Sequence, residues 1–175
     1  MARKPRKLEI SPVPQDLHTI NLRKYLPRKQ WEQLRAELIQ KHSVRCQICR
    51  KDVSAPRAAQ AHEVWEYDTS SSPAIAHLKG LSLACWQCHL SEHWGKLSGI
   101  AMTRPGLLAE TIAHYCKVNK VSRTTFARDK TRAFAAWDKL NELEWEIDWG
   151  DYAPMLQACL GKVPKLRWYL DPNER

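Results

Sequence analysis

The sequence predicts an α+β protein, mostly helical, in which a small two-stranded core is stapled by cysteines and flanked by N- and C-terminal helices. Two Cys-x-x-Cys pairs, Cys46–Cys49 and Cys85–Cys88, enclose 35 residues that contain two short strand patterns. Apolar residues at helical spacing precede the first pair and follow the second. The chain has 175 residues, of which 43% are hydrophobic, so it can bury a real core.

The N-terminal part begins with a basic segment. Residues 1–20 contain three prolines and four basic side chains close to the start, and this composition predicts a flexible arm. A helix is expected from Pro27 to about residue 42, because proline suits the first helical position. Trp31, Leu34 and Leu38 then recur at helical spacing, and the helix leads directly into the first cysteine pair.

The middle of the chain predicts a compact motif. Gln60–Trp65 and Leu81–Ala84 are predicted strands, and the Ser- and Pro-rich residues 69–73 are a loop signal between them. Trp86–Leu97 predicts a helix that starts at the second cysteine pair. We expect residues 21–104 to form one domain that contains both cysteine pairs.

Residues 105–175 are expected to form a helical extension packed on that domain. Leu107–Cys116 predicts one helix, and Ser122 is a suitable N-cap for a longer one. The apolar stripe of the longer helix predicts core packing. The acidic, Trp-containing residues 142–151 are expected to form a solvated face or to face a basic patch, and a protein partner site is the alternative.

Four of the six cysteines have the spacing of a structural zinc site. In such a site four thiolates surround a tetrahedral ion, and a two-residue spacer lets both sulfurs of a pair reach it. The predicted zinc ligands are Cys46, Cys49, Cys85 and Cys88. A redox Cys-x-x-Cys pair and buried free thiols are the alternatives. Cys116 and Cys159 are isolated, so we expect them to be packed thiols.

The formal net charge is +9, which favours an anionic partner. Residues 1–50 hold 12 basic and 4 acidic side chains, and residues 101–135 hold 7 and 2, so positive charge flanks the cysteine-bearing middle. This arrangement predicts that the protein binds nucleic acid, and DNA is the first expectation. The side chains expected to make phosphate contacts are Arg3, Lys4, Arg6, Lys7, Arg123, Arg128, Lys130 and Arg132.

No membrane partner is expected, because no apolar run approaches the ~20 residues of a membrane span. The basic N-terminus has no following apolar stretch and is not a secretory signal. A cytoplasmic location is therefore the expectation. The sequence leaves the oligomeric state open.

Three histidines form the candidate reactive centre. His62 stands in the first predicted strand, within Ala-His-Glu-Val-Trp. His89 and His93 are four residues apart on the predicted helix, so their side chains share one face at ~6 Å and can hold one divalent ion. The sequence thus indicates a closed cysteine centre and an open histidine centre on one helix. The His-Glu-x-x-His protease motif fails, because position 66 is Glu.

The pattern resembles the HNH endonucleases and their ββα-metal fold. It consists of a strand with His62, a second strand and a His-bearing helix, held together by two cysteine pairs. The resemblance covers about residues 43–98. The tail from Trp137 to Pro154 is also similar to a group of small bacterial and phage HNH proteins. The resemblance implies a metal-dependent DNA endonuclease that hydrolyses phosphodiester bonds. His62 would be the general base, and His89 and His93 would hold the catalytic Mg²⁺, Mn²⁺, Ni²⁺ or Zn²⁺.

Two positions depart from the family motif. Ala61 stands where a metal ligand usually precedes the base, and Gly80 falls near the place of the middle Asn. Glu63, Asp68, His77 or water could supply the missing ligand. The alternative function is a catalytically inactive, zinc-stapled nucleic-acid-binding protein. A protein-interaction zinc domain of the RING or LIM kind is disfavoured, because it needs a denser ligand series.

Overall fold

The computed structural model describes residues 5–55 and 58–163, and the fold of this part is α+β. Arg3 and Lys4 lie outside the described residues, as do 164–175 of the predicted C-terminal extension. The helices are η1 (Gln15–Leu17), α1 (Leu22–Tyr25), α2 (Arg28–Lys41), α3 (Trp86–Glu92), α4 (Trp94–Ala101), α5 (Leu107–Asn119), α6 (Arg123–Leu140), η2 (Gly150–Tyr152) and α7 (Ala153–Leu160). The strands are β1 (Ala59–Asp68), β2 (Ala74–Cys85) and β3 (Trp145–Asp148).

A long hairpin forms the centre of the fold. β1 and β2 are antiparallel, and β3 adds to β2 in parallel, which gives the order β1-β2-β3. The register pairs His62 with Ser82 and shifts between Val64 and Trp65. Gly80 lies opposite this irregularity. Its φ of +147° is a backbone conformation that residues with a Cβ rarely adopt.

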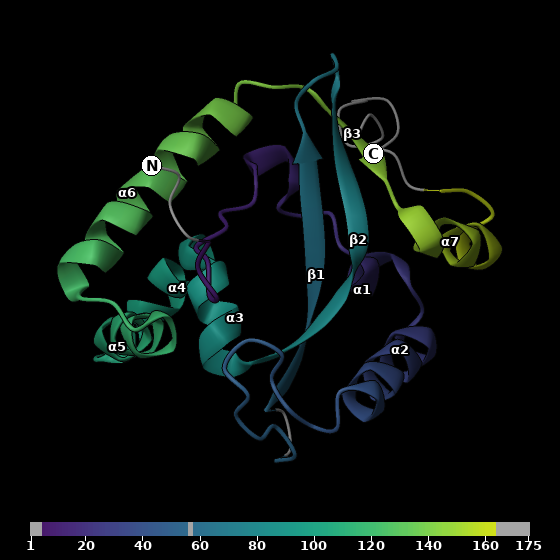
Figure 1. Cartoon of the computed structure of the whole chain (residues 1–175). Coiled ribbons are helices and arrows are strands. Elements are labelled where there is room, and N and C mark those ends of the chain that lie inside the picture. Colours follow the sequence, from purple (N-terminus) through teal and green to yellow (C-terminus); the bar gives the residue numbers. More distant parts are fainter. Residues whose placement is uncertain (1–4, 56–57, 164–175) are drawn as a thin grey trace.

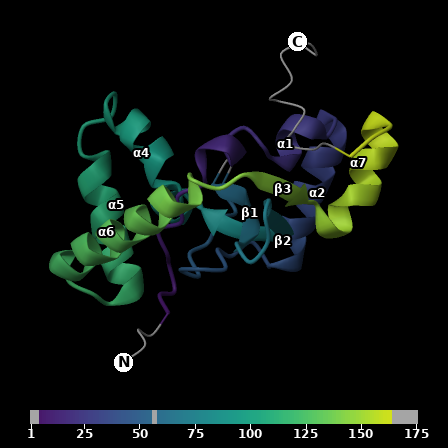
Figure 2. The same cartoon turned by 90° about the horizontal axis from the view of Figure 1, so that it is seen from above.

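Two hydrophobic cores lie on the two sides of the hairpin. Figures 1 and 2 show α4, α5 and α6 on one side and α1, α2 and α7 on the other. The first core joins Leu83, Leu90 and Trp94 to the helices α5 and α6. The second core packs Leu22 and Trp31 against the part of β2 next to Trp149. The hairpin is therefore held from both faces, which fixes the direction of the side chains on β1.

The predicted helices 27–42, 107–116 and 122 onward are confirmed in position, with small shifts at their ends. The Ser122 side chain accepts the backbone N–H of Thr125, as expected of an N-cap. Both predicted strands exist but are longer than expected, because they pair over the whole hairpin. The predicted helix 86–97 is divided at His93, whose backbone leaves the helical region at φ −95° and ψ 65°.

The acidic, Trp-containing segment has exposed carboxylates, as expected of a solvated face, but it also contains a strand that was not expected. Trp145 and Trp149 are buried at 3% and 1% exposure, and Glu146 and Asp148 between them face outward. This alternation is that of a half-buried strand, β3. Gly150 then approaches β2 so closely that a Cβ would lie 2.9 Å from the Leu78 carbonyl oxygen. The two tryptophans therefore serve the core and not an exposed partner surface.

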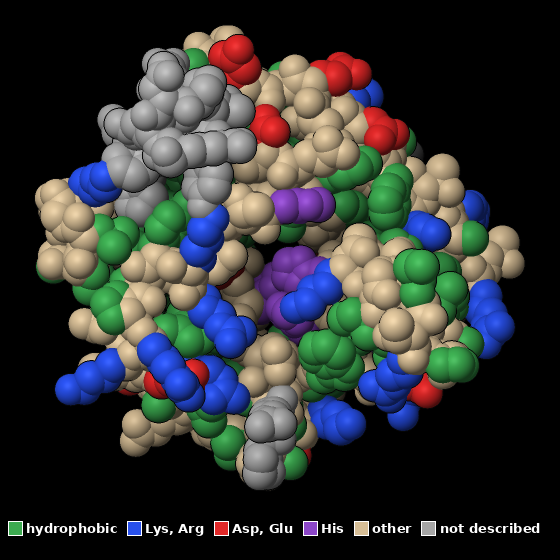
Figure 3. All heavy atoms as spheres, turned by 180° about the vertical axis from the view of Figure 1, so that it is seen from behind, with side chains coloured by type: hydrophobic (Ala, Val, Ile, Leu, Met, Phe, Trp, Pro, Cys, Tyr) green, Lys and Arg blue, Asp and Glu red, His purple; other side chains and the backbone are tan. Residues whose placement is uncertain are grey.

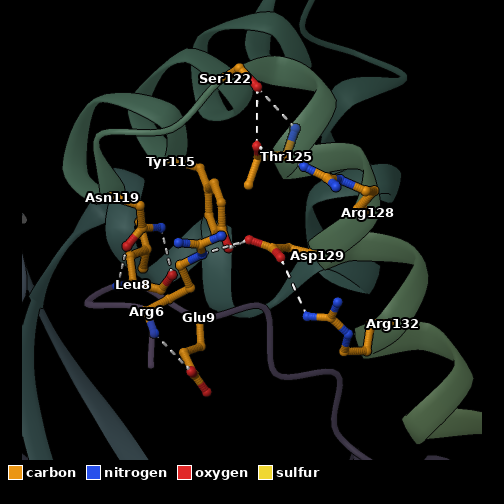
Figure 4. Close-up of polar contacts among 10 residues, drawn as sticks. All are labelled: Arg6, Leu8, Glu9, Tyr115, Asn119, Ser122, Thr125, Arg128, Asp129 and Arg132. Atoms are coloured by element: carbon orange, nitrogen blue, oxygen red, sulfur yellow. Dashed lines mark hydrogen bonds and ion pairs between the residues drawn. The ribbon is translucent and has the colours of Figure 1, made fainter. Parts of the chain in front are cut away.

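The N-terminal segment is packed in its described part and does not behave as a free arm. Leu8 is fully buried, and its backbone exchanges two hydrogen bonds with the Asn119 side chain (Figure 4). The Arg6 guanidinium lies 2.7 Å from Asp129, which also accepts the Tyr115 hydroxyl at 3.0 Å. Apolar residues between positions 8 and 20 are buried and hold the segment on the domain, which the composition of the first residues did not indicate.

We expect Arg6→Ala to lower the free energy of unfolding by about 1–2 kcal/mol, because the buried Asp129 loses a charged donor. Arg128→Ala, which changes an exposed side chain on the same helix as Asp129, is the control and should change stability little. Urea unfolding measures both. Equal stabilities of the two variants would contradict a structural role for Arg6.

Candidate metal centres

Two short loops bring four cysteine sulfurs together at the base of the hairpin. Cys46 and Cys49 lie in the loop closed by the bridge between Arg45 and Asp52. Cys85 ends β2 and is also the N-cap of α3, so Cys88 lies one turn into that helix. The four sulfurs lie within 4.8 Å of one another, close enough to hold one metal ion. We call these four residues the cysteine cluster.

The sulfurs of the cysteine cluster lie close to hydrogen-bond donors and to one another. The backbone N–H groups of Cys49 and Cys88 point at the sulfurs of Cys46 and Cys85, each at 3.5 Å. His114 on α5 adds a contact of 3.1 Å from Nε2 to the Cys88 sulfur. Hydrogen bonds from Cys85 and Cys88 lower the pKa of the Cys46 thiol, and the same crowding raises the pKa of Cys85 to about 11. A bound cation would relieve this competition for protons.

His114 is a neighbour of the cysteines that no sequence spacing indicates. It lies 26 residues after Cys88, on a helix whose docking against α3 only the fold determines.

The three predicted histidines also meet, on the other side of α3. His62 comes from β1, His89 from α3, and His93 from the residue that divides α3 from α4. One nitrogen of each lies within 4.8 Å of the others, and Nδ1 of His62 is 3.0 Å from Nε2 of His93. The ring centroids are 4.6–5.4 Å apart. We call these residues the histidine cluster.

The histidine cluster has the properties of a metal-ligand set. Nδ1 of His89 is buried and has no hydrogen-bond partner in the described part of the chain. Burial lowers the pKa of His62 to about 4 and the pKa of His89 and His93 to about 3. All three rings are therefore neutral at pH 7 and have lone pairs to donate. A divalent ion is the group that this donor set fits.

Two buried carboxylates lie near the histidine cluster. Oε2 of Glu92 is 3.6 Å from Nε2 of His62 and has no hydrogen-bond partner within the described residues. Burial raises the pKa of Glu92 to about 8. Glu63 accepts the backbone N–H of Leu22 at 2.6 Å and the indole N–H of Trp65, so it ties β1 to α1. Burial raises the pKa of Glu63 to about 7.

Two of the ligands considered for the missing motif position, His77 and Asp68, lie elsewhere, and Glu63 is held by its contacts with Leu22 and Trp65. His77 pairs with Asp148 at 2.8 Å and Asp68 ends β1, both toward the far end of the hairpin. His62 itself is the third member that joins His89 and His93.

The histidine cluster opens into a groove with a volume of about 1330 Å³. Figure 3 shows histidine side chains at the floor of a hollow, with Lys and Arg side chains around it. We call this hollow the histidine groove. Its basic lining residues are Arg23, Arg28, Arg35 and Lys96, and its lining carboxylates are Glu32 and Glu63.

None of the six described residues that were predicted to contact phosphate lines the histidine groove. Arg6 is paired with Asp129, and Lys130 lies over the rings of Trp94 and Phe134. Lys7 lines a different pocket, next to Cys49. The remaining three, Arg123, Arg128 and Arg132, are exposed along α6. The counts of charged residues along the sequence identified the basic segments. They did not indicate on which side of the molecule these segments lie.

Among the described helices, none is both long and apolar enough to cross a membrane. Comparison with protein-family models, curated proteins and solved structures finds no match to this chain. The geometry of the chain itself therefore carries the interpretation: a closed group of four thiols and an open group of three imidazoles, to which successive residues of α3, Cys88 and His89, belong.

We expect the protein to bind two divalent ions with different consequences. Cys88→Ser should lose one ion and unfold below 37 °C, because Cys88 is fully buried beside three other sulfurs. His93→Ala should lose the other ion and keep its fold. Elemental analysis and circular dichroism measure both effects. One ion per chain in both the wild type and His93→Ala would contradict an ion in the histidine cluster.

Proposed function

We propose that the protein is a metal-dependent endonuclease of the HNH type that hydrolyses phosphodiester bonds in DNA. The observation that carries the proposal is the convergence of three neutral imidazoles at the floor of an open, basic-edged groove. A structural site is usually closed by four protein ligands, whereas a catalytic one keeps a position for water or substrate. The cysteine cluster fits the first kind, as a structural zinc site, and the histidine cluster fits the second.

The geometry supports His62 better as a third ligand than as the general base. Its Nδ1 faces His93, within 3.0 Å, and therefore faces the place of the ion. A divalent ion held there would bind a phosphate oxygen, lower the pKa of a bound water and stabilise the charge that develops in the transition state. The three histidines hold the ion and leave its remaining positions toward the groove.

Glu92 would fix the orientation of His62. With Nδ1 of His62 toward the ion, Nε2 carries the proton and points at the Glu92 carboxyl group, 3.6 Å away, which the nearby cation would hold ionised. This arrangement of carboxylate, histidine and metal sets the tautomer and raises the basicity of the ligand. Glu92 would thus orient His62, which is the role that the middle Asn usually has in the HNH motif. This chain has Gly80 near the place of that Asn.

The nucleic acid would lie in the histidine groove. Arg23 and Arg28 are exposed on one wall and Lys96 on the other, so cationic groups stand on both sides of the histidines. Such contacts neutralise phosphates and position the backbone without reading sequence. The exposed arginines of α6 would extend the basic surface beyond the groove.

The test of the proposed function is nicking of supercoiled plasmid with Mg²⁺, Mn²⁺, Ni²⁺ or Zn²⁺. We expect His62→Ala, His89→Ala and His93→Ala each to lower the rate at least 100-fold, because each removes a ligand. His42→Ala, a histidine at the end of α2 and outside the groove, is the control. Folded wild type without activity under every ion, but with salt-sensitive DNA binding, would favour the inactive binding protein.

A second prediction concerns Glu92. Glu92→Gln should weaken ion binding at the histidine cluster about tenfold, since it removes the carboxyl group that the bound cation would ionise and that would then orient His62. The same change should leave the ion-free protein as stable or more stable, because it removes an uncompensated buried carboxyl. Calorimetric titration with Mn²⁺ and thermal unfolding give the two readouts. Glu32→Gln, in the same groove, is the control. Unchanged ion affinity in Glu92→Gln would overturn the positioning role.

A further inference from the structure

A second pocket lies against the outer side of the cysteine cluster, away from the histidine groove. It has a volume of about 440 Å³ and is built from four segments: the N-terminal segment, the loop of the first cysteine pair, the start of α3, and α5. Its lining residues are Lys7, Cys49, Lys51, Gln87, His114, Lys117 and Val118. We call it the lysine pocket, because three lysines from distant parts of the sequence meet there.

Cys49 differs from the other members of the cysteine cluster. Cys46, Cys85 and Cys88 are buried at 4% exposure or less, whereas Cys49 is half-buried and lines the lysine pocket. Cys46 and Cys85 each face a backbone N–H, and Cys88 faces His114. For Cys49, the described residues provide a contact only with the Cys85 sulfur, at 3.6 Å. Cys49 is therefore the sulfur with the least shielding from a reagent.

The charges around the lysine pocket favour the approach of anions to Cys49. The three ammonium groups stand at the same opening as the Cys49 sulfur, and no carboxylate is among the described residues that line it. Nearby cations raise the local concentration of anionic reagents.

We propose that Cys49 is a modification site, at which the cysteine cluster reacts with small anionic disulfides drawn into the lysine pocket. The Cys49 thiolate attacks one sulfur of the disulfide, forms a mixed disulfide and releases one thiolate. The Cys85 thiolate, 3.6 Å away, then attacks the Cys49 sulfur and releases the second thiolate. The electron pair passes from the two cysteines to the reagent, which is reduced to two thiols while Cys49 and Cys85 form a disulfide.

The consequence is loss of the structural ion. Two of its four ligands become a neutral disulfide, and Cys46 and Cys88 alone cannot hold the ion in a tetrahedral site. Because Cys85 joins β2 to α3, the loss would loosen the helix that carries His89. This inference concerns the cysteine cluster and does not depend on the proposed nuclease activity.

The experiment uses the full-length, zinc-loaded protein and two probes: oxidised glutathione, which is anionic, and 2-hydroxyethyl disulfide, which is neutral. Zinc release is followed with a chromogenic indicator, and the modified cysteine is identified by mass spectrometry after trapping free thiols. We expect the first mixed disulfide at Cys49. We also expect zinc release to be about threefold to tenfold faster with the anionic probe at low salt.

The double variant Lys51→Ala, Lys117→Ala should remove the preference for the anionic probe and leave the rate with the neutral probe unchanged. Both side chains are exposed, so the variant should fold. Arg123→Ala with Arg128→Ala removes the same charge from α6 and is the matched control, in which the preference should persist. A first modification at Cys116 or Cys159 without zinc release, or a preference that survives in the lysine variant, would overturn the proposal.

Discussion

The direct junction of β2 and α3 at Cys85 is the constraint on which both candidate metal centres depend. The last residue of the strand is also the N-cap of the helix, so no loop separates them. Cys88 and His89 are neighbours in the first turns of α3, and successive helical side chains point in different directions. The helix therefore directs Cys88 toward the first cysteine pair and His89 toward β1. A shift of one residue at the junction would misplace ligands of both centres together.

The two centres have different surroundings, and the difference follows from what packs beside them. The cysteine cluster is closed by α5 and by the loop of the first cysteine pair, and three of its four sulfurs are almost fully buried. The histidine cluster faces the space between α2 and α4, where the groove remains open. The same helix thus presents a closed face suited to stability and an open face suited to a ligand from solution.

The sequence was most informative where spacing alone determines chemistry. Two Cys-x-x-Cys pairs predict four sulfurs around one point, and a separation of four residues on a helix predicts that His89 and His93 meet. The strand β3 was not predicted, because four residues of alternating burial are too short a pattern among so many carboxylates. The pairing of Arg6 with Asp129, and the approach of His114 to Cys88, depend on the docking of distant segments, which no local pattern encodes.

The central claim is that His62, His89 and His93 hold a divalent ion separate from the one in the cysteine cluster. Anomalous diffraction from crystals of the metal-loaded protein tests it most directly. We expect two peaks, one with four sulfurs at about 2.3 Å and one with three histidine nitrogens at about 2.0–2.1 Å if the metal is zinc. A single peak at the cysteines, with Nδ1 of His62 still hydrogen-bonded to His93, would contradict the account.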